Sequence, residues 1–212
     1  FTQIDTTEQD TLTVIGEYLE MYQDGKRVIC VDSVEIIRGD IFATCDTLEY
    51  DRENEQIHLI NSPQIRQQDQ RMTGNSVTLL LEESEVVGIV ITGNAIATTS
   101  VDSSITTPIP YDLLTGEEMT IFVTDEELDS LIVRGRATSY YHVLDDGAEE
   151  GMNKVLGDQL FMAFDADTLS RVRVTSSPSV STGSFHPVGH QQELETELRE
   201  LLTRLNLNLD LK

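Results

Sequence analysis

The residues best suited to metal binding or catalysis are scattered along this chain. His186 and His190 are four residues apart, the spacing at which two histidines on one helix bind a metal. Pro187 and Gly189 lie between them and disfavour a helix. We therefore interpret the pair as part of a surface turn and expect no metal site there.

Acidic residues are frequent, but they do not have the spacing of a known site. Asp145–Gly147 and Asp165–Asp167 are acidic segments whose oxygen atoms suit calcium, yet they lack the alternating ligands and closing glutamate of an EF-hand loop. No carboxylate pair has a spacing recognisable for hydrolysis. The phosphate-binding glycine motifs and the GxSxG nucleophile motif are also absent. The sequence therefore predicts no enzyme, no cofactor and no metal.

The charge balance excludes another class of function. The chain has 38 acidic residues against 14 lysines and arginines, a net charge of −24. Nucleic acids and anionic membranes are bound by clustered basic residues, so neither is an expected partner. The acidity fits either a surface that binds divalent cations or a solvating shell like that of proteins from high-salt organisms. We favour the shell, because the acids are spread over predicted turns and exposed strand faces.

The positioning elements are strands, in about five repeated strand-turn-strand units. The clearest unit runs from Gly74 to Ala97, and similar units begin at Gly116 and Gly157. In each unit apolar residues alternate with other residues, as in a strand with one buried face. Five positions after each glycine repeat their apolar character: Val77, Leu79, Leu81, Ile89 and Ile91; Met119, Ile121, Val123, Leu131 and Val133; Leu160, Met162, Phe164, Val172 and Val174. The three units close at Ala95, Ala137 and Pro178.

Two earlier units follow the pattern less closely. One begins at Gly39 and is about three residues longer, which places Ile57 and Leu59 in the return strand. The other begins at Gly16 and turns at Asp24–Gly25. A unit this small cannot bury its apolar face alone, so neighbouring units must stack. We therefore predict an all-β domain of stacked antiparallel hairpins over residues 1–185.

The remaining segment, residues 186–212, has a different pattern. After a predicted turn at Phe185–Pro187, leucines at positions 194, 198, 201 and 205 have the spacing of an amphipathic helix. Residues 205–211 then alternate as an edge strand would, so a helix followed by a strand and one helix with a frayed tail both remain open. The segment either docks a partner or caps the open end of the strand stack, and we favour capping.

The two cysteines, Cys30 and Cys45, fall on strands that we expect to be adjacent. Adjacent strands could bring the sulfur atoms within bridging distance, but we favour two separate buried thiols. Two thiols do not define a redox compartment. No stretch approaches 18 apolar residues, so no membrane-spanning helix is predicted.

Short motifs where the units open and close are similar to those of a known family. They comprise Gly74–Asn75 and Gly157–Asp158, Gly93–Ala95 and Gly135–Ala137, Ala43, Asp46, Leu48 and Tyr50 with the return strand 57–63, and the entry segment Asn153–Asp158. With these motifs, about residues 16–183 resemble the OstA-like, LptA-type lipopolysaccharide-transport domain.

The resemblance implies an open β-jellyroll, or folded β-taco, without catalytic residues or cofactor. Family members carry lipopolysaccharide across the periplasm, hold its acyl chains in a groove and join end to end through strand edges. For this chain it implies a periplasmic carrier of lipopolysaccharide or a related glycolipid, with the fifteen repeated apolar residues lining the groove. Partners would be other β-jellyroll transport components or further copies. The basic cluster nearest to hand for lipid phosphates is Arg134, Arg136, Arg171 and Arg173.

Other classes of protein share parts of this pattern. The chain could be a membrane-tethered relative of these carriers or the periplasmic part of an outer-membrane assembly protein. A structural or adhesive β-solenoid with a packed core and no lipid is the main alternative. A carbohydrate-active β-helix enzyme is a third, and it would need a carboxylate pair inside a cleft.

Overall fold

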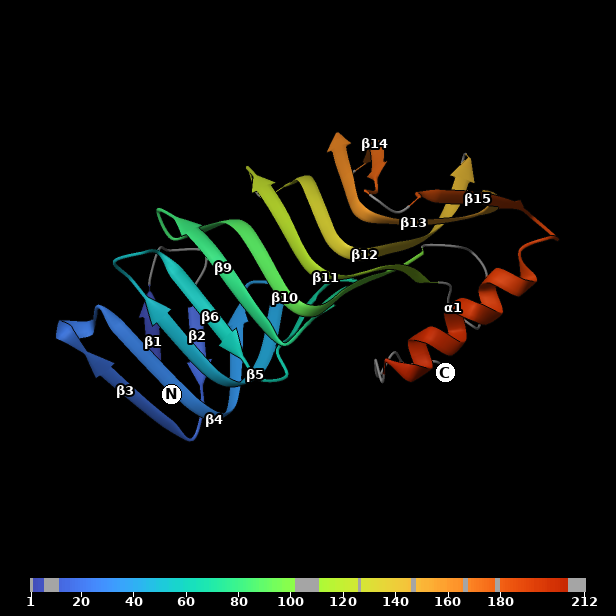
Figure 1. Ribbon diagram of the computed structural model, residues 1–212. Helices are drawn as coiled ribbons and strands as arrows, with labels where there is room; N and C mark the ends of the chain where they lie inside the picture. The colour runs from blue at the N-terminus through green and yellow to red at the C-terminus, as the bar shows by residue number, and fades with distance from the viewer. Residues whose placement is uncertain are drawn as a thin grey trace.

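The computed structural model describes residues 2–5, 12–101, 111–125, 127–145, 148–165, 168–177 and 180–205. Within these residues 15 strands form one antiparallel sheet, followed by a single α-helix (Figure 1). The predicted all-β fold of stacked antiparallel hairpins with a short C-terminal helix is confirmed.

The elements follow the chain with short connections. They are β1 (Thr2–Asp5), β2 (Leu12–Ile15), β3 (Tyr18–Tyr22), the 3-10 turn η1 (Gln23–Gly25), β4 (Arg27–Arg38), β5 (Ile41–Asp51), β6 (Gln56–Ile60), β7 (Gln64–Gln67), β8 (Gln70–Thr73), β9 (Ser76–Glu82), β10 (Glu85–Ser100), β11 (Tyr111–Thr124), β12 (Glu127–Asp145), β13 (Ala148–Asp165), β14 (Thr168–Thr175), β15 (Thr182–Pro187) and α1 (Gln192–Arg204).

The sheet folds into two layers that share their longest strands. Layer A contains β3, β6, β9 and β14, and layer B contains β1, β2, β7, β8 and β15. The strands β4, β5 and β10 to β13 contribute one half to each layer. Figure 1 shows the long strands bending where the two layers meet. The interior therefore lies between two layers that are joined along one side and open along the other.

Irregular residues form the corner between the layers. The pairing register shifts between Val31 and Val34, between Thr92 and Ala95, and between Arg134 and Ala137. Two consecutive residues with positive φ occur at four of the corner positions, namely Asp32–Ser33, Asn61–Ser62, Gly93–Asn94 and Gly135–Arg136. Extra residues of this kind bend a strand sharply. The Gly-x-Ala ends of the repeated units are thus the corners of the fold.

The glycines that open the units are explained by close packing. A Cβ atom on Gly74 or Gly157 would lie 2.5 Å from Ile91 Cγ2 or Val174 Cγ1. The same position in the unit of Gly116 would overlap the Val133 side chain. Each glycine therefore makes room for the side chain seventeen residues later.

The predicted start of the second unit is wrong. Gly39 has a positive φ and lies in the hairpin turn between β4 and β5. The corner position of the second unit is instead Cys45, which lies three residues before Leu48 and pairs with Val34. Gly39–Asp40 has the same sequence as the opening pair Gly157–Asp158 but a different role. Both a tight turn and a crowded corner favour glycine.

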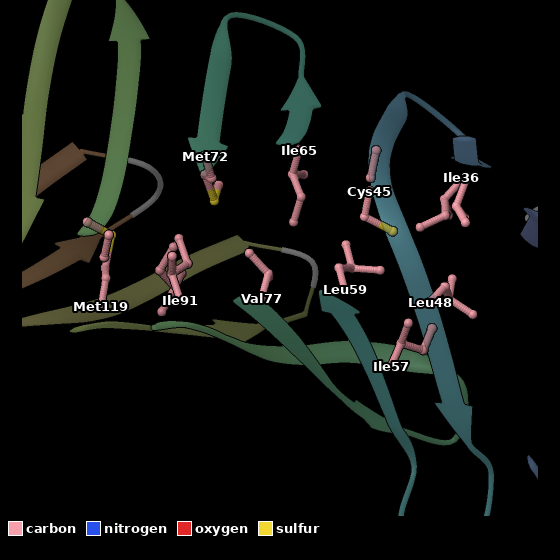
Figure 2. Packing of buried hydrophobic residues seen from close by; sticks show 14 of the residues in the cluster. Ile36, Cys45, Leu48, Ile57, Leu59, Ile65, Met72, Val77, Ile91 and Met119 are labelled. Carbon is pink, nitrogen blue, oxygen red and sulfur yellow. The ribbon is translucent and has the colours of Figure 1, made fainter. Parts of the chain in front are cut away.

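Strand register aligns the repeated apolar residues into ladders across layer A. One ladder joins Cys30, Leu48, Leu59, Val77, Ile91, Met119, Val133, Leu160 and Val174. A second joins Val28, Tyr50, Ile57, Leu79, Ile89, Ile121, Leu131, Met162 and Val172. Figure 2 shows Ile65 and Met72 of layer B facing Leu59 and Val77 of layer A. Apart from Val172, these residues belong to one continuous hydrophobic core.

Helix α1 packs on the outer face of layer B. Leu194, Leu198 and Leu202 are buried in a second apolar cluster with residues of the central strands, which are Ile96, Tyr111, Leu113, Tyr140 and Met152. Their strand neighbours, such as Ala95 and Ala97, face the main core instead. The amphipathic helix is confirmed, but it covers a face of layer B (Figure 1) and not the open end that we expected it to cap.

Three further expectations concern the C-terminal region and the cysteines. Phe185–Pro187 belongs to β15 and pairs with β13, so the predicted turn is wrong, because the chain turns only at Val188–His190. Cys30 and Cys45 are both buried free thiols. Pro178 and the alternating residues 206–211 lie outside the described residues.

Candidate functional site

An apolar trough opens between the two layers in the N-terminal half of the sheet. Its cavity volume is about 70 Å³, and it opens to solvent. Sixteen residues from both layers line it: Leu12, Ile36, Arg38, Ile41, Ala43, Tyr50, Ile57, Leu59, Ile65, Gln67, Met72, Leu79, Leu81, Ser84, Val86 and Ile89. A concave lining that is mostly apolar with a few polar groups is typical of small-molecule binding.

Of the fifteen residues predicted for a lipid groove, three line this trough. They are Leu79, Leu81 and Ile89, from β9 and β10. Eleven others belong to the same hydrophobic core but are not among the trough residues: Val77, Ile91, Met119, Ile121, Val123, Leu131, Val133, Leu160, Met162, Phe164 and Val174. Met119 and Val133 have no exposed surface. The core is therefore closely packed at β11 and β12 and hollow nearer the N-terminus.

Val172 is placed differently from the prediction of an interior position. Its side chain is 43% exposed, although its register partner Met162 is buried. Among the described strands, β14 ends layer A and pairs only with β13. Val172 therefore lacks the neighbouring strand that covers the equivalent residues Ile89 and Leu131.

Sequence reasoning missed the half of the trough that layer B supplies. Ile36, Ile41, Ile65 and Met72 line it. Ile65 and Met72 lie opposite Leu59 and Val77 of layer A (Figure 2). Register pairs Ile36 with Ala43, and Ile65 with Met72. Alternation in residues 34–38 and 64–72 was the available signal, but it spans few residues between turns and does not recur at fixed offsets.

The polar groups of the trough gather at its rim. Arg38 ends β4 in layer B, and its Nη1 donates a hydrogen bond to the backbone carbonyl of Ser84, at a distance of 2.7 Å. Ser84 lies in the turn between β9 and β10, so the bond joins the free ends of the two layers. The described lining contains no histidine, cysteine or carboxylate. This arrangement can shield hydrocarbon from water and offers one cation at the opening.

A buried Asp112–His142 pair is the strongest polar feature away from the trough. Asp112 Oδ1 accepts a hydrogen bond from the backbone N–H of His142, at an N–O distance of 2.8 Å. The same oxygen is hydrogen-bonded to His142 Nδ1, also at 2.8 Å. The His142 side chain is only 4% exposed. Burial raises the pKa of the Asp112 carboxyl, while the hydrogen bonds from His142 act in the opposite direction. The pair joins β11 to β12 beyond their last paired residues and faces no described cavity.

Other candidates from the sequence are not assembled into a site by the described structure. His186 lies on β15 and His190 in the turn that follows it. No three His, Cys, Asp or Glu side chains among the described residues gather as metal ligands would. Parts of the two acidic segments, residues 146–147 and 166–167, lie outside the described residues.

Two of the four arginines in the predicted basic cluster form ion pairs with acids. Arg134 forms an ion pair with Glu118 at 2.9 Å, and Arg136 forms one with Glu117 at 3.3 Å. Arg171 and Arg173 are exposed on β14. None of the four arginines lines the trough.

Comparison with known proteins finds similar chains among the solved structures. No family model matches the chain, and no curated protein matches it. Among solved structures, the chain is similar to the crystal structure of LptH from Pseudomonas aeruginosa, described as the LptA-homologous periplasmic component of the lipopolysaccharide transport device. The match has 14% identity and a TM-score of 0.49, and covers 68% of this chain and 92% of that one. Within the described residues, no helix has both the length and the apolar character needed to cross a membrane.

Proposed function

We propose that this chain is a non-enzymatic lipid carrier of the periplasm, which holds acyl chains of lipopolysaccharide or a related glycolipid between its two layers. The trough carries this proposal, because it is concave, apolar and open to solvent on one side. The repeated glycine-opened units, with their resemblance to lipopolysaccharide-transport domains, support it. Each methylene group that leaves water contributes about 0.8 kcal/mol to binding.

The proposed carrier passes lipid along by pairing strand edges with another protein. Among the described strands, β3 and β14 end layer A, and β1 and β15 end layer B. Unpaired strand edges accept strands from other chains. Pairing at either end would extend both layers together, so the interior would continue into a second copy or another β-jellyroll component.

A charged residue in the trough tests the binding proposal. We expect Leu79→Glu to reduce binding of lipopolysaccharide by at least about tenfold, because a carboxylate in an apolar site loses hydration without gaining a partner. Leu80→Glu is the matched control, since Leu80 is the next residue of β9, does not line the trough and is only partly exposed. Bound lipid is measured by native mass spectrometry after incubation with lipopolysaccharide, and folding by circular dichroism.

Normal lipid binding by folded Leu79→Glu protein would contradict the trough as the binding site. Clean wild-type protein that refuses added lipid would instead favour a structural or adhesive β-solenoid. The complete burial of Met119 and Val133 is the observation that favours this solenoid alternative.

A further inference from the structure

Arg38 occupies a distinctive position among the basic residues of this acidic chain. It is the only basic residue among the described residues that line the trough, which otherwise has Tyr50, Gln67 and Ser84 as its polar members. The corner of β4 lies at Asp32–Ser33, and Arg38 is at the far end of the layer B half of this strand, so it stands at the open rim. Its side chain is partly buried there and reaches from layer B to layer A.

The charge of Arg38 has no carboxylate partner in the described part of the chain. Its hydrogen bond goes to a neutral carbonyl oxygen, and none of the ion pairs includes it. Arg27, by contrast, forms an ion pair with Glu49 at 2.7 Å. A guanidinium has five N–H donors in a planar fork, and one hydrogen bond of Arg38 is seen within the described residues, so donors remain for a ligand. A partly buried charge without a counterion is costly, and this cost is recovered when an anion binds.

We infer that Arg38 binds one anionic oxygen group, a carboxylate or a phosphate, at the head of the lipid whose acyl chain enters the trough. This inference rests on the proposed function and adds the charge of the ligand to it. Arginine matches the planar oxygens of carboxylate and phosphate with two parallel hydrogen bonds. The acyl chain of the lipid would lie among Leu79, Leu81 and Ile89, and its charged head group would remain at the rim.

The surroundings of Arg38 limit the ligand to little negative charge. Glu83 and Glu85 flank Ser84 on the same rim, and both are exposed without pairing to Arg38. Their field extends about 8 Å at physiological ionic strength. A second anionic group close to the first would therefore meet repulsion. We expect a head with one anionic group beside the chain to bind best.

Three probes with sixteen-carbon chains separate the contribution of the head-group charge to binding from that of the hydrocarbon. They are hexadecanoic acid, hexadecyl phosphate and neutral methyl hexadecanoate, titrated against the whole chain at about pH 8, where a carboxylic acid is ionised. We expect the wild-type protein to bind at least one charged probe about tenfold more tightly than the ester, as for a charge-assisted hydrogen bond. The charged probe that is preferred identifies the head group.

Variants then test whether Arg38 causes the preference. Arg38→Gln is expected to bind all three probes alike, whereas Arg38→Lys keeps the preference for charge. Arg136→Gln removes the same charge from a side chain that is 88% exposed and away from the trough, and should behave as wild type. For each variant we compare the ratio of the dissociation constants of the charged probe and the ester. This ratio corrects for any change in the trough when the hydrogen bond to Ser84 is lost.

The outcomes separate this inference from the proposed function. Equal binding of all three probes by the wild-type protein, or an equal loss of preference in Arg38→Gln and Arg136→Gln, would overturn the role of Arg38 and leave the acyl trough standing. If neither the ester nor the charged probes bind, the trough does not accept acyl chains, and both proposals fail together.

Discussion

Gly116 stands where any larger side chain would overlap Val133 of the adjoining strand. We expect Gly116→Ala to lower the free energy of unfolding by about 1–3 kcal/mol, because extra atoms in a close-packed core force neighbours out of position. Gly183→Ala is the control, since no atom lies within 4 Å of a Cβ placed there. Urea unfolding followed by circular dichroism measures both variants.

The Val133 side chain itself provides a second test of this explanation. The double variant Gly116→Ala with Val133→Ala is expected to lose less stability than the two single losses added together, because the removed methyl groups make room for the new one. Additive losses would show that Gly116 is needed for another reason.

Single residues also show how far sequence reasoning reaches. The repeated slots identified Val77, Ile91 and Met119 correctly as core, because register places residues with the same offset side by side. Val172 has the same offset but lies on the last strand of layer A, where it is exposed. The repeat describes what a residue faces within a unit, and the presence of a neighbouring unit decides whether it is covered.

The hydrogen bonds between Asp112 and His142 tie two whole strands together. Burial raises the pKa of Asp112 in the folded protein above its unfolded value, which is about 3.9. The folded state therefore binds more protons than the unfolded state between these two pKa values. The stabilising contribution of Asp112 is complete below the unfolded value and falls as pH rises through the folded one.

We therefore expect wild-type protein to lose stability relative to Asp112→Asn as pH rises from about 3.9, until the folded pKa is passed. Asparagine keeps an oxygen that can accept the His142 N–H but does not ionise. Unfolding free energies of both proteins, measured across this pH range, provide the comparison. A difference that stays constant with pH would mean that Asp112 titrates alike in the folded and unfolded chain.

At the scale of strands, the sequence predicts layer A better than layer B. In layer A, β9 has seven residues, Ser76 to Glu82, over which the inward positions alternate, and its offsets recur in later units. Layer B instead uses small residues such as Ala95 and Ala137 inside, and carries Leu113 and Met152 outside, where α1 covers them. With apolar residues on both faces, alternation no longer distinguishes the inner face. The trough half supplied by β7 and β8 was missed for a different reason, because each of these strands has only 4 residues over which to alternate.

The ends of the whole molecule govern its association. We expect wild-type protein to associate as its concentration rises, through edges such as β14, and Val172→Lys to prevent this, because lysine on an edge strand disfavours pairing with another strand. Val180→Lys adds the same charge at a residue that is 82% exposed and outside the described strands. Sedimentation velocity over a range of concentrations distinguishes the variants. Equal association of all three proteins would exclude this edge from the contact.

Because the repeated hairpins carry their own corner residues, the length of the molecule depends on how many hairpins it contains. Four of the hairpins bring their own pair of left-handed residues, and the units from Gly74 and Gly116 also bring the glycine that makes room for the facing side chain. Two strands at a spacing of about 4.8 Å add roughly 9.6 Å to both layers at once. Duplication or loss of one such segment, for example residues 74–115, would change the reach of the protein in a fixed step while its cross-section stays the same. A lineage could therefore fit the molecule to a longer or shorter span without redesigning its interior.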